Sequence, residues 1–257
     1  MLPQTPALEL LPNCFRNARL IATDMDGTLT DEGKFSGMLF TALEALAKAG
    51  WPVLIVTGRS AGWVNGIAHY LPVMGAIAEN GGVFYDSQGD RHILTDLPDL
   101  PLHRQALATT FRQIQALYSD LTESIDNPFR LTDWTFDIQG LDQPDLEAIG
   151  HICQEQGWDF TYSTVQCHIT PPGQNKAKAV LRAIAQQCPP YTADQVVTVG
   201  DSPNDVSLFD PQYFPCSVGV ANLEQYRDRL QHFPRHLTTA PEVEGFCELV
   251  QTLLQQP

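Results

Sequence analysis

The chain has 257 residues, a net charge of −15 and a hydrophobic fraction of 43%. This acidic balance argues against a nucleic-acid partner, which needs basic patches, and no apolar run reaches the roughly 18 residues of a membrane span. The segment before Leu20 lacks a basic start followed by an apolar stretch, so we expect no secretory signal. The six cysteines are scattered, which predicts reduced, mostly buried thiols and a cytoplasmic location.

Apolar strands and a helix open the chain. Continuous apolar runs, the pattern of buried strands, lie at 20–22, 53–56 and 76–78. Leucines recur at helical spacing between Ser36 and Gly50. Strand, helix and strand with fully apolar strands predict a parallel sheet that is covered on both faces. At Asn80-Gly81 we expect a hairpin that leaves this sheet.

The pattern then changes to helices and short strands of mixed polarity. Helices are predicted at 103–118 and 144–156, and strands at 130–138, 158–162 and 165–170. These elements predict a smaller α+β cap domain, residues 84–172, inserted into an α/β core of residues 1–83 and 173–257. The core resumes with a helix at 176–187, strands at 196–199 and 216–220, and a closing helix at 243–254. The fold class is therefore a Rossmann-like parallel-sheet core with an insertion.

Two aspartates, Asp24 and Asp26, follow the first strand. Residues i and i+2 of an extended backbone point the same way, so the two carboxylates can converge. Converging carboxylates need a cation, a shared proton or separate roles. One arrangement makes Asp24 both a Mg²⁺ ligand and a nucleophile and leaves Asp26 to handle protons. The alternative is a simple turn, since Asp and Gly favour turns.

Polar residues also lie at the ends of other core elements. They are Thr57, Lys176, Asp201, Asn204 and Asp205. The ends of parallel strands face one crevice, where these groups would supply the parts for Mg²⁺-assisted phosphoryl transfer. Two alternatives stay open: Thr57 can bond local backbone, and Lys178 is a nearby rival to Lys176.

The chain resembles the haloacid dehalogenase superfamily of phosphatases over about 19–83 and 173–250. The resemblance rests on four motifs in the family's order: Asp24-Met25-Asp26-Gly27-Thr28-Leu29, Thr57-Gly58-Arg59, Lys176, and Gly200-Asp201-Ser202-Pro203-Asn204-Asp205. The insertion resembles that of the branch with an α/β cap. That branch holds many sugar-phosphate phosphatases, including sucrose-phosphate and mannosyl-phosphoglycerate phosphatases.

The resemblance implies a Mg²⁺-dependent phosphomonoester hydrolase that acts on a small phosphorylated metabolite, such as a sugar phosphate. Asp24 would form an aspartyl-phosphate, and Asp26 would protonate the leaving oxygen and then deprotonate water. The residues implied for phosphate binding are Thr57, Gly58, Lys176 and Asn204. Those implied for metal binding are Asp24, Asp26 through its backbone carbonyl, Asp201 and Asp205.

Other interpretations remain at this stage. A phosphosugar mutase would use the same aspartyl-phosphate, and a silent sugar-phosphate-binding module would keep the fold without activity. Arg59 suits an ion pair as well as a substrate contact, and Asn80 can simply form a turn. Three polar residues of the insertion can face the substrate or the solvent: Arg130, Asp133 and His168. No oligomeric state is predicted.

Overall fold

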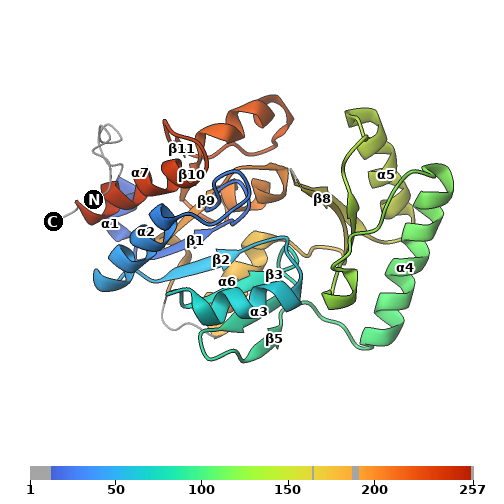
Figure 1. Ribbon diagram of the computed structural model, residues 1–257, viewed down its shortest axis with the longest axis horizontal. Coiled ribbons are helices and arrows are strands. Elements are labelled where there is room, and N and C mark those ends of the chain that lie inside the picture. The colour runs from blue at the N-terminus through green and yellow to red at the C-terminus, as the bar shows by residue number, and fades with distance from the viewer. Residues whose placement is uncertain (1–12, 164, 187–190, 256–257) are drawn as a thin grey trace.

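A sheet of eight strands forms the centre of the structure, a computed structural model that describes residues 13–163, 165–186 and 191–255 (Figure 1). From one edge to the other, its strands are β11 (His236–Leu237), β10 (Cys216–Gly219), β9 (Val196–Gly200), β1 (Leu20–Thr23), β2 (Val53–Val56), β3 (Gly75–Ala78), β4 (Val83–Asp86) and β5 (Arg91–Ile93). Strands β11 to β3 are parallel, and β4 and β5 extend the sheet antiparallel. The mainly parallel sheet confirms the predicted α/β class.

Helices cover both faces of this sheet because its strands are apolar on both sides. In β1, Ile21 packs in one apolar cluster, whereas Leu20 and Ala22 pack in a second cluster on the other face. The helices of this part of the chain are α1 (Asn13–Asn17), α2 (Gly37–Lys48), α3 (Ala61–Tyr70), α6 (Lys176–Gln186), η2 (Ala193–Gln195), η3 (Pro203–Phe209), η4 (Ala221–Arg229) and α7 (Glu242–Leu254). Side chains of α2, α3 and α7 belong to the Ile21 cluster, and those of α6 and η3 to the other.

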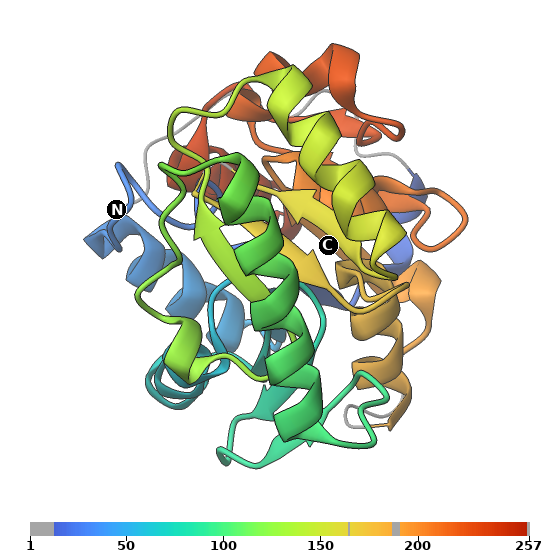
Figure 2. The same ribbon diagram turned by 90° about the vertical axis from the view of Figure 1, so that its right-hand side faces the viewer.

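A second sheet of three antiparallel strands lies beside the first. Its order is β6 (Trp134–Asp137), β8 (Gln166–Thr170), β7 (Asp159–Tyr162). Helices α4 (Leu100–Leu117) and α5 (Gln143–Glu155) pack on one face of it, around Phe136 and Ile169. Figures 1 and 2 show both helices on the outside of the molecule, so the opposite face of this sheet is turned toward the large sheet.

The hairpin after Asn80 does not leave the large sheet, so that prediction is wrong. Ala78 pairs with Val83 in an antiparallel register, and β5 then pairs with β4. Phe84 is fully buried in the apolar cluster that contains Leu20, which explains why this strand stays on the sheet. The large sheet therefore continues to residue 93, past the predicted boundary at 84. The division of the chain into core and cap domain stays a prediction.

Two further expectations concern membrane-spanning helices and thiols. In the described ranges, no helix is both long enough and apolar enough to cross a membrane. Four cysteines are buried, as expected: Cys153, Cys167, Cys216 and Cys247. The predictions for Cys14 and Cys188 concern side chains outside the described part of the chain.

The junction between the two sheets is fixed by the buried carboxylate of Glu79. This side chain accepts hydrogen bonds from the backbone nitrogens of Ala61 at 2.9 Å, Leu131 at 3.0 Å and Thr132 at 2.6 Å. Burial raises the pKa of Glu79, and these donors offset part of that cost. Glu79 and Asn80 both have positive φ, at 55° and 52°, a conformation that costs about 1 kcal/mol or more per residue and needs such support.

Gly82 gives a direct test of this junction. A Cβ at Gly82 would lie 1.8 Å from Oγ1 of Thr132, whereas a Cβ at Gly66 in α3 would meet nothing within 4 Å. We expect Gly82→Ala to lower the free energy of unfolding by about 1–3 kcal/mol, through overpacking against a hydrogen-bonded side chain. The matched Gly66→Ala should raise it by about 0.5–1 kcal/mol. Urea unfolding measures both values, and equal stabilities for the two variants would contradict the close approach.

Candidate active site

The polar residues predicted to share a crevice follow neighbouring strands. β1 pairs with β9 on one side and with β2 on the other, so the carboxyl ends of all three lie at one edge of the sheet. Asp24, Asp201 and Thr57 come directly after these strands. The backbone nitrogen of Asp24 donates to the carbonyl of Val199 at 2.9 Å, which anchors the start of its loop.

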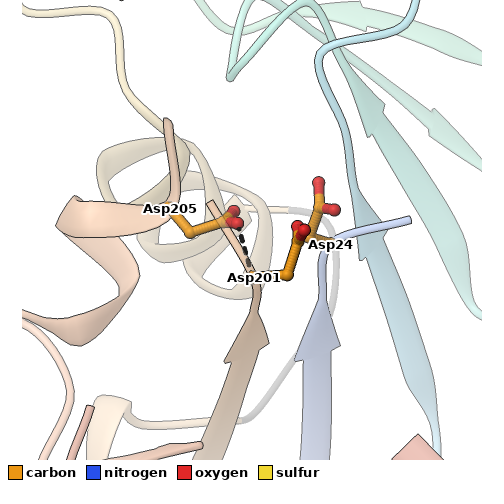
Figure 3. Close-up of side chains that lie close together, drawn as sticks. All are labelled: Asp24, Asp201 and Asp205. Atoms are coloured by element: carbon orange, nitrogen blue, oxygen red, sulfur yellow. Dashed lines mark hydrogen bonds between the residues drawn. The ribbon is translucent and has the colours of Figure 1, made fainter. Parts of the chain in front are cut away.

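Three buried aspartates meet at this edge: Asp24, Asp201 and Asp205. Each offers a carboxylate oxygen within 4.8 Å of the others. Figure 3 shows Asp24 and Asp201 at the tips of adjacent strands, with Asp205 facing them from the first turn of η3. Nζ of Lys176, at the start of α6, donates to Oδ1 of Asp24 at 2.5 Å and to Oδ1 of Asp205 at 2.7 Å.

The charges in this cluster are unbalanced, because one ammonium group faces three carboxylates. Burial, together with the neighbouring Asp205 and Asp26, raises the pKa of Asp24 to about 7 against the opposing effect of Lys176. Burial also raises the pKa of Asp201 well above its ordinary value. Burial alone would lower the pKa of Lys176, but the carboxylates of Asp205 and Asp24 keep it above its ordinary range. Lys176 therefore stays protonated, and its single positive charge does not balance the three carboxylates beside it.

The cluster fits a divalent cation. Oδ2 of Asp201 accepts a hydrogen bond from Asn222 at 2.9 Å, but its buried Oδ1 has no hydrogen-bond partner in the described part of the chain. A buried oxygen without a donor is costly unless a cation or proton meets it. Carboxylate oxygens are the hard ligands that Mg²⁺ prefers, and its charge would offset the surplus. The donor chemistry thus agrees with the predicted metal ligands Asp24, Asp201 and Asp205.

Small residues let the carboxylates come this close. Gly27 has a φ of 79°, and a Cβ there would lie 2.3 Å from Oδ2 of Asp201. Asp205 turns back on its own loop, where Oδ2 accepts from the backbone nitrogens of Asp201 at 3.0 Å and Ser202 at 3.1 Å. Gly27 is therefore needed for the close approach of Asp201, and Asp205 stabilises its own loop in addition to its predicted role as a metal ligand.

Asp26 stands apart from this cluster. Its carboxylate forms a two-pronged ion pair with Arg59, at 2.9 Å from Nε and 2.6 Å from Nη2. The hydrogen bonds that Arg59 donates to Asp26 raise the pKa of Arg59, so the guanidinium group stays charged. Arg59 is thus an ion-pair partner, one of the two alternatives that its sequence left open. The pair fixes the direction of the carboxylate that was predicted to handle protons.

A small cavity lies between the core and the insertion, beside Asp24 and Asp26. Its lining from the core side comprises Asp24, Asp26, Gly58, Arg59, Ser202 and Asn204. Its lining from the insertion comprises Ser163, Val165, Gln166 and His168. Two residues predicted to bind phosphate, Thr57 and Lys176, lie behind this lining rather than in it, and Lys176 reaches the cavity edge through Asp24.

Thr57 and Asn204, both predicted to bind phosphate, differ in their hydrogen bonds. The Thr57 hydroxyl accepts from the backbone nitrogen of Arg59 at 3.1 Å, which is the local bonding weighed as its alternative. Asn204 donates to the side chain of Asn80 at 3.1 Å and accepts from Ser202 at 2.7 Å. Asn80 is therefore more than a turn former, because it orients a residue of the cavity wall.

Sequence reasoning missed Asn222 and left the insertion undecided. Asn222, on η4, bridges Oδ2 of Asp201 and the carbonyl of Gly27, and nothing in its local sequence marks it. Arg130 is buried and bonds Asp126, Asp133 and the carbonyl of Gly58. It therefore clamps the insertion to the second motif instead of facing the cavity.

The raised pKa values predict a pH dependence for the metal-free protein. Folding raises the pKa of Asp24 and Asp201. Between about pH 4 and pH 7 the folded chain therefore binds more protons than the unfolded chain. The free energy of unfolding that these two aspartates contribute falls as pH rises through this window. We expect chelator-treated Asp201→Asn to gain stability relative to wild type as pH rises through this window. Urea unfolding at several pH values measures the difference, and a constant difference would contradict the charge surplus.

Comparison with known proteins agrees with this geometry. Residues 21–109 match the model of a family described as haloacid dehalogenase-like hydrolase. A protein of Archaeoglobus fulgidus named phosphoglycolate phosphatase is 29% identical over 241 residues, which cover 91% of this chain and 96% of that protein. A protein of the same name from Aeropyrum pernix is 24% identical over 242 residues, covering 93% and 94%.

Solved structures share the fold. A Thermoplasma acidophilum protein superposes with a TM-score of 0.73 at 20% identity, covering 92% of this chain and 98% of that one. The C-terminal domain of the trehalose-6-phosphate phosphatase of C. albicans gives 0.69 at 17% identity, covering 99% of each. The family match and the relatives confirm the predicted resemblance to the haloacid dehalogenase superfamily of phosphatases, and the solved structures share its fold.

Proposed function

We propose that the protein is a Mg²⁺-dependent phosphomonoester hydrolase that acts on a small phosphorylated metabolite, a sugar phosphate, through an aspartyl-phosphate. The observation that carries the proposal is the contact of Lys176 with Asp24 and Asp205 beside Asp201, at the edge of a small cavity. The relatives named phosphoglycolate phosphatase support a small phosphate ester as substrate. We also propose that the enzyme works in the cytoplasm, where its buried thiols would stay reduced.

In this proposal Asp24 is the nucleophile. Lys176 holds one of its oxygens, so the other is free to attack phosphorus while the bond to the leaving oxygen breaks. The ammonium group also neutralises charge that builds up on the phosphoryl oxygens. Mg²⁺ held by Asp24, Asp201, Asp205 and the backbone carbonyl of Asp26 would offset the remaining negative charge.

Asp26 moves the protons. It gives a proton to the leaving oxygen in the first step and takes one from the attacking water in the second, which returns Asp24 and releases phosphate. Arg59 keeps this carboxylate in one direction through both steps. Thr57, Gly58 and Asn204 are the proposed donors to the phosphoryl oxygens.

The insertion would select the substrate. Its residues Ser163, Val165, Gln166 and His168 form one wall of the cavity. Because the cavity is small and has walls from both the core and the insertion, we propose that residues 84–172 act as a cap that opens to admit substrate and release product.

The nucleophile can be tested with one substitution and a close control. Asp24→Asn removes the attacking oxygen, so we expect Mg²⁺-dependent release of phosphate from p-nitrophenyl phosphate to fall by about 10⁴-fold or more. Asp31→Asn makes the same chemical change at an exposed residue of the same loop and should leave the rate unchanged. Wild type without Mg²⁺-dependent activity, or an Asp24→Asn variant that keeps it, would refute the mechanism. A mutase would instead yield an isomer of a sugar phosphate with little free phosphate.

The proton role of Asp26 predicts a dependence on the leaving group. Asp26→Asn should slow hydrolysis of an alkyl phosphate by about 10²–10⁴-fold, because its alkoxide leaves poorly without a proton. p-Nitrophenolate leaves without such help, so its formation in the first turnover should slow much less. Rapid-mixing kinetics on both substrates give the two ratios. Equal losses for the two would show that Asp26 has only a structural role through Arg59.

A further inference from the structure

His168 is the residue of the insertion that meets the reacting edge of the core. Its neighbours on β8, Cys167 and Ile169, pack in the apolar cluster under α4 and α5, so the imidazole lies on the opposite face, toward the large sheet. The ring lies against Gly58, where a Cβ would come within 3.0 Å of Cε1 and 3.1 Å of Nε2. His168 is 1% exposed and lines the cavity together with Asp24 and Asp26.

The hydrogen bonds around His168 determine which ring nitrogen carries the proton. Nδ1 lies 2.8 Å from Oδ2 of Asp133. Both oxygens of Asp133 also accept from Nη1 of Arg130 at 3.0 Å. Burial would raise the pKa of Asp133, but Arg130 and His168 together outweigh burial and hold the pKa below its ordinary value, so this group is an ionised acceptor. Nδ1 must therefore be the donor.

The second ring nitrogen is left with a lone pair. Burial lowers the pKa of His168 despite the bond to Asp133, so the ring is neutral at neutral pH. A neutral imidazole protonated at Nδ1 can only accept a hydrogen bond at Nε2. Among the residues that the structure describes, none donates a hydrogen bond to Nε2. The cavity wall thus contains an acceptor that no described donor reaches.

Three cationic side chains near the cavity already form ion pairs with carboxylates of the chain. Arg59 pairs with Asp26, Arg130 with Asp126 and Asp133, and Lys176 with Asp24 and Asp205. A carboxylate on the leaving group would face the lone pair of Nε2 without a free cation of the described chain to balance it. A hydroxyl group in the same place would supply the missing donor.

We propose that His168 is a specificity residue that accepts a hydrogen bond at Nε2 from a hydroxyl group of the leaving alcohol, so that phosphates of polyols are preferred over phosphates of hydroxy acids. The inference rests on the proposed phosphatase function and deepens it. It also sets this chain apart from its relatives named phosphoglycolate phosphatase, since phosphoglycolate has a carboxylate on its leaving group.

Matched substrates separate the two classes. 2-Hydroxyethyl phosphate and 2-phosphoglycolate differ only in a hydroxymethyl group against a carboxylate, and glycerol 3-phosphate and 3-phosphoglycerate form the same pair with one more carbon. In at least one pair we expect wild type to prefer the hydroxyl member by about tenfold or more in kcat/KM, since a site that hydrogen-bonds a substrate hydroxyl discriminates strongly.

Two variants link this preference to His168. His168→Asn keeps a side-chain amide that can donate to Asp133 and removes Nε2, so the preference should fall to about threefold or less. Because the preference is a ratio of two substrates measured on one variant, a general loss of activity, followed with p-nitrophenyl phosphate, does not alter it. His151→Ala changes an exposed histidine of α5 and should leave every ratio unchanged.

The outcomes distinguish the inference from the function on which it rests. If wild type hydrolyses p-nitrophenyl phosphate but favours the carboxylate member of each pair, or shows no preference, the function stands and the role of His168 is wrong. The same holds if His168→Asn keeps the wild-type preference. If wild type releases phosphate from none of these compounds, the proposed function itself fails, and the inference fails with it.

Discussion

The structure depends on how one lysine is shared between two buried carboxylates. Lys176 bonds Asp24 and Asp205 while Asp201 remains beside them with an oxygen that no described donor reaches. One ammonium group cannot balance three carboxylates, so the cluster has surplus negative charge in a place where water does not relieve it. That surplus stabilises a bound cation, and it makes the metal-free fold less stable than it could be, as is common where a site is built for function.

The rest of the fold keeps these groups together. Parallel pairing of β1 with β9 and β2 brings their carboxyl ends to one edge, and η4 adds Asn222 from a distant part of the chain. On the opposite side, Glu79 and Arg130 tie the insertion to α3 and to Gly58 with buried, hydrogen-bonded charges. The insertion, which forms one wall of the cavity, is thereby attached to the loop at Gly58, a proposed phosphate ligand.

Much of the fold could be predicted because apolar runs and polar strand ends are local signals. The run 53–56 matches β2, and Asp24 and Asp201 lie together as parallel topology requires. Helix α3 was not predicted, because its glycine-rich sequence buries only Ala61, Val64 and Ala68. Strand β5 has mostly exposed side chains and exists because β4 offers it a backbone partner. The partners of Arg59, Arg130 and Asp201 could not be predicted, since each depends on contacts between distant segments.

The central claim is that the Asp24 carboxylate, held by Lys176, accepts the phosphoryl group. Acid quenching of the enzyme during turnover of p-nitrophenyl phosphate with Mg²⁺, followed by peptide mass spectrometry, shows which residue is phosphorylated. The account predicts a phosphoryl group on the peptide that contains Asp24, located on that residue by fragmentation. A phosphoryl group on any other side chain would contradict it.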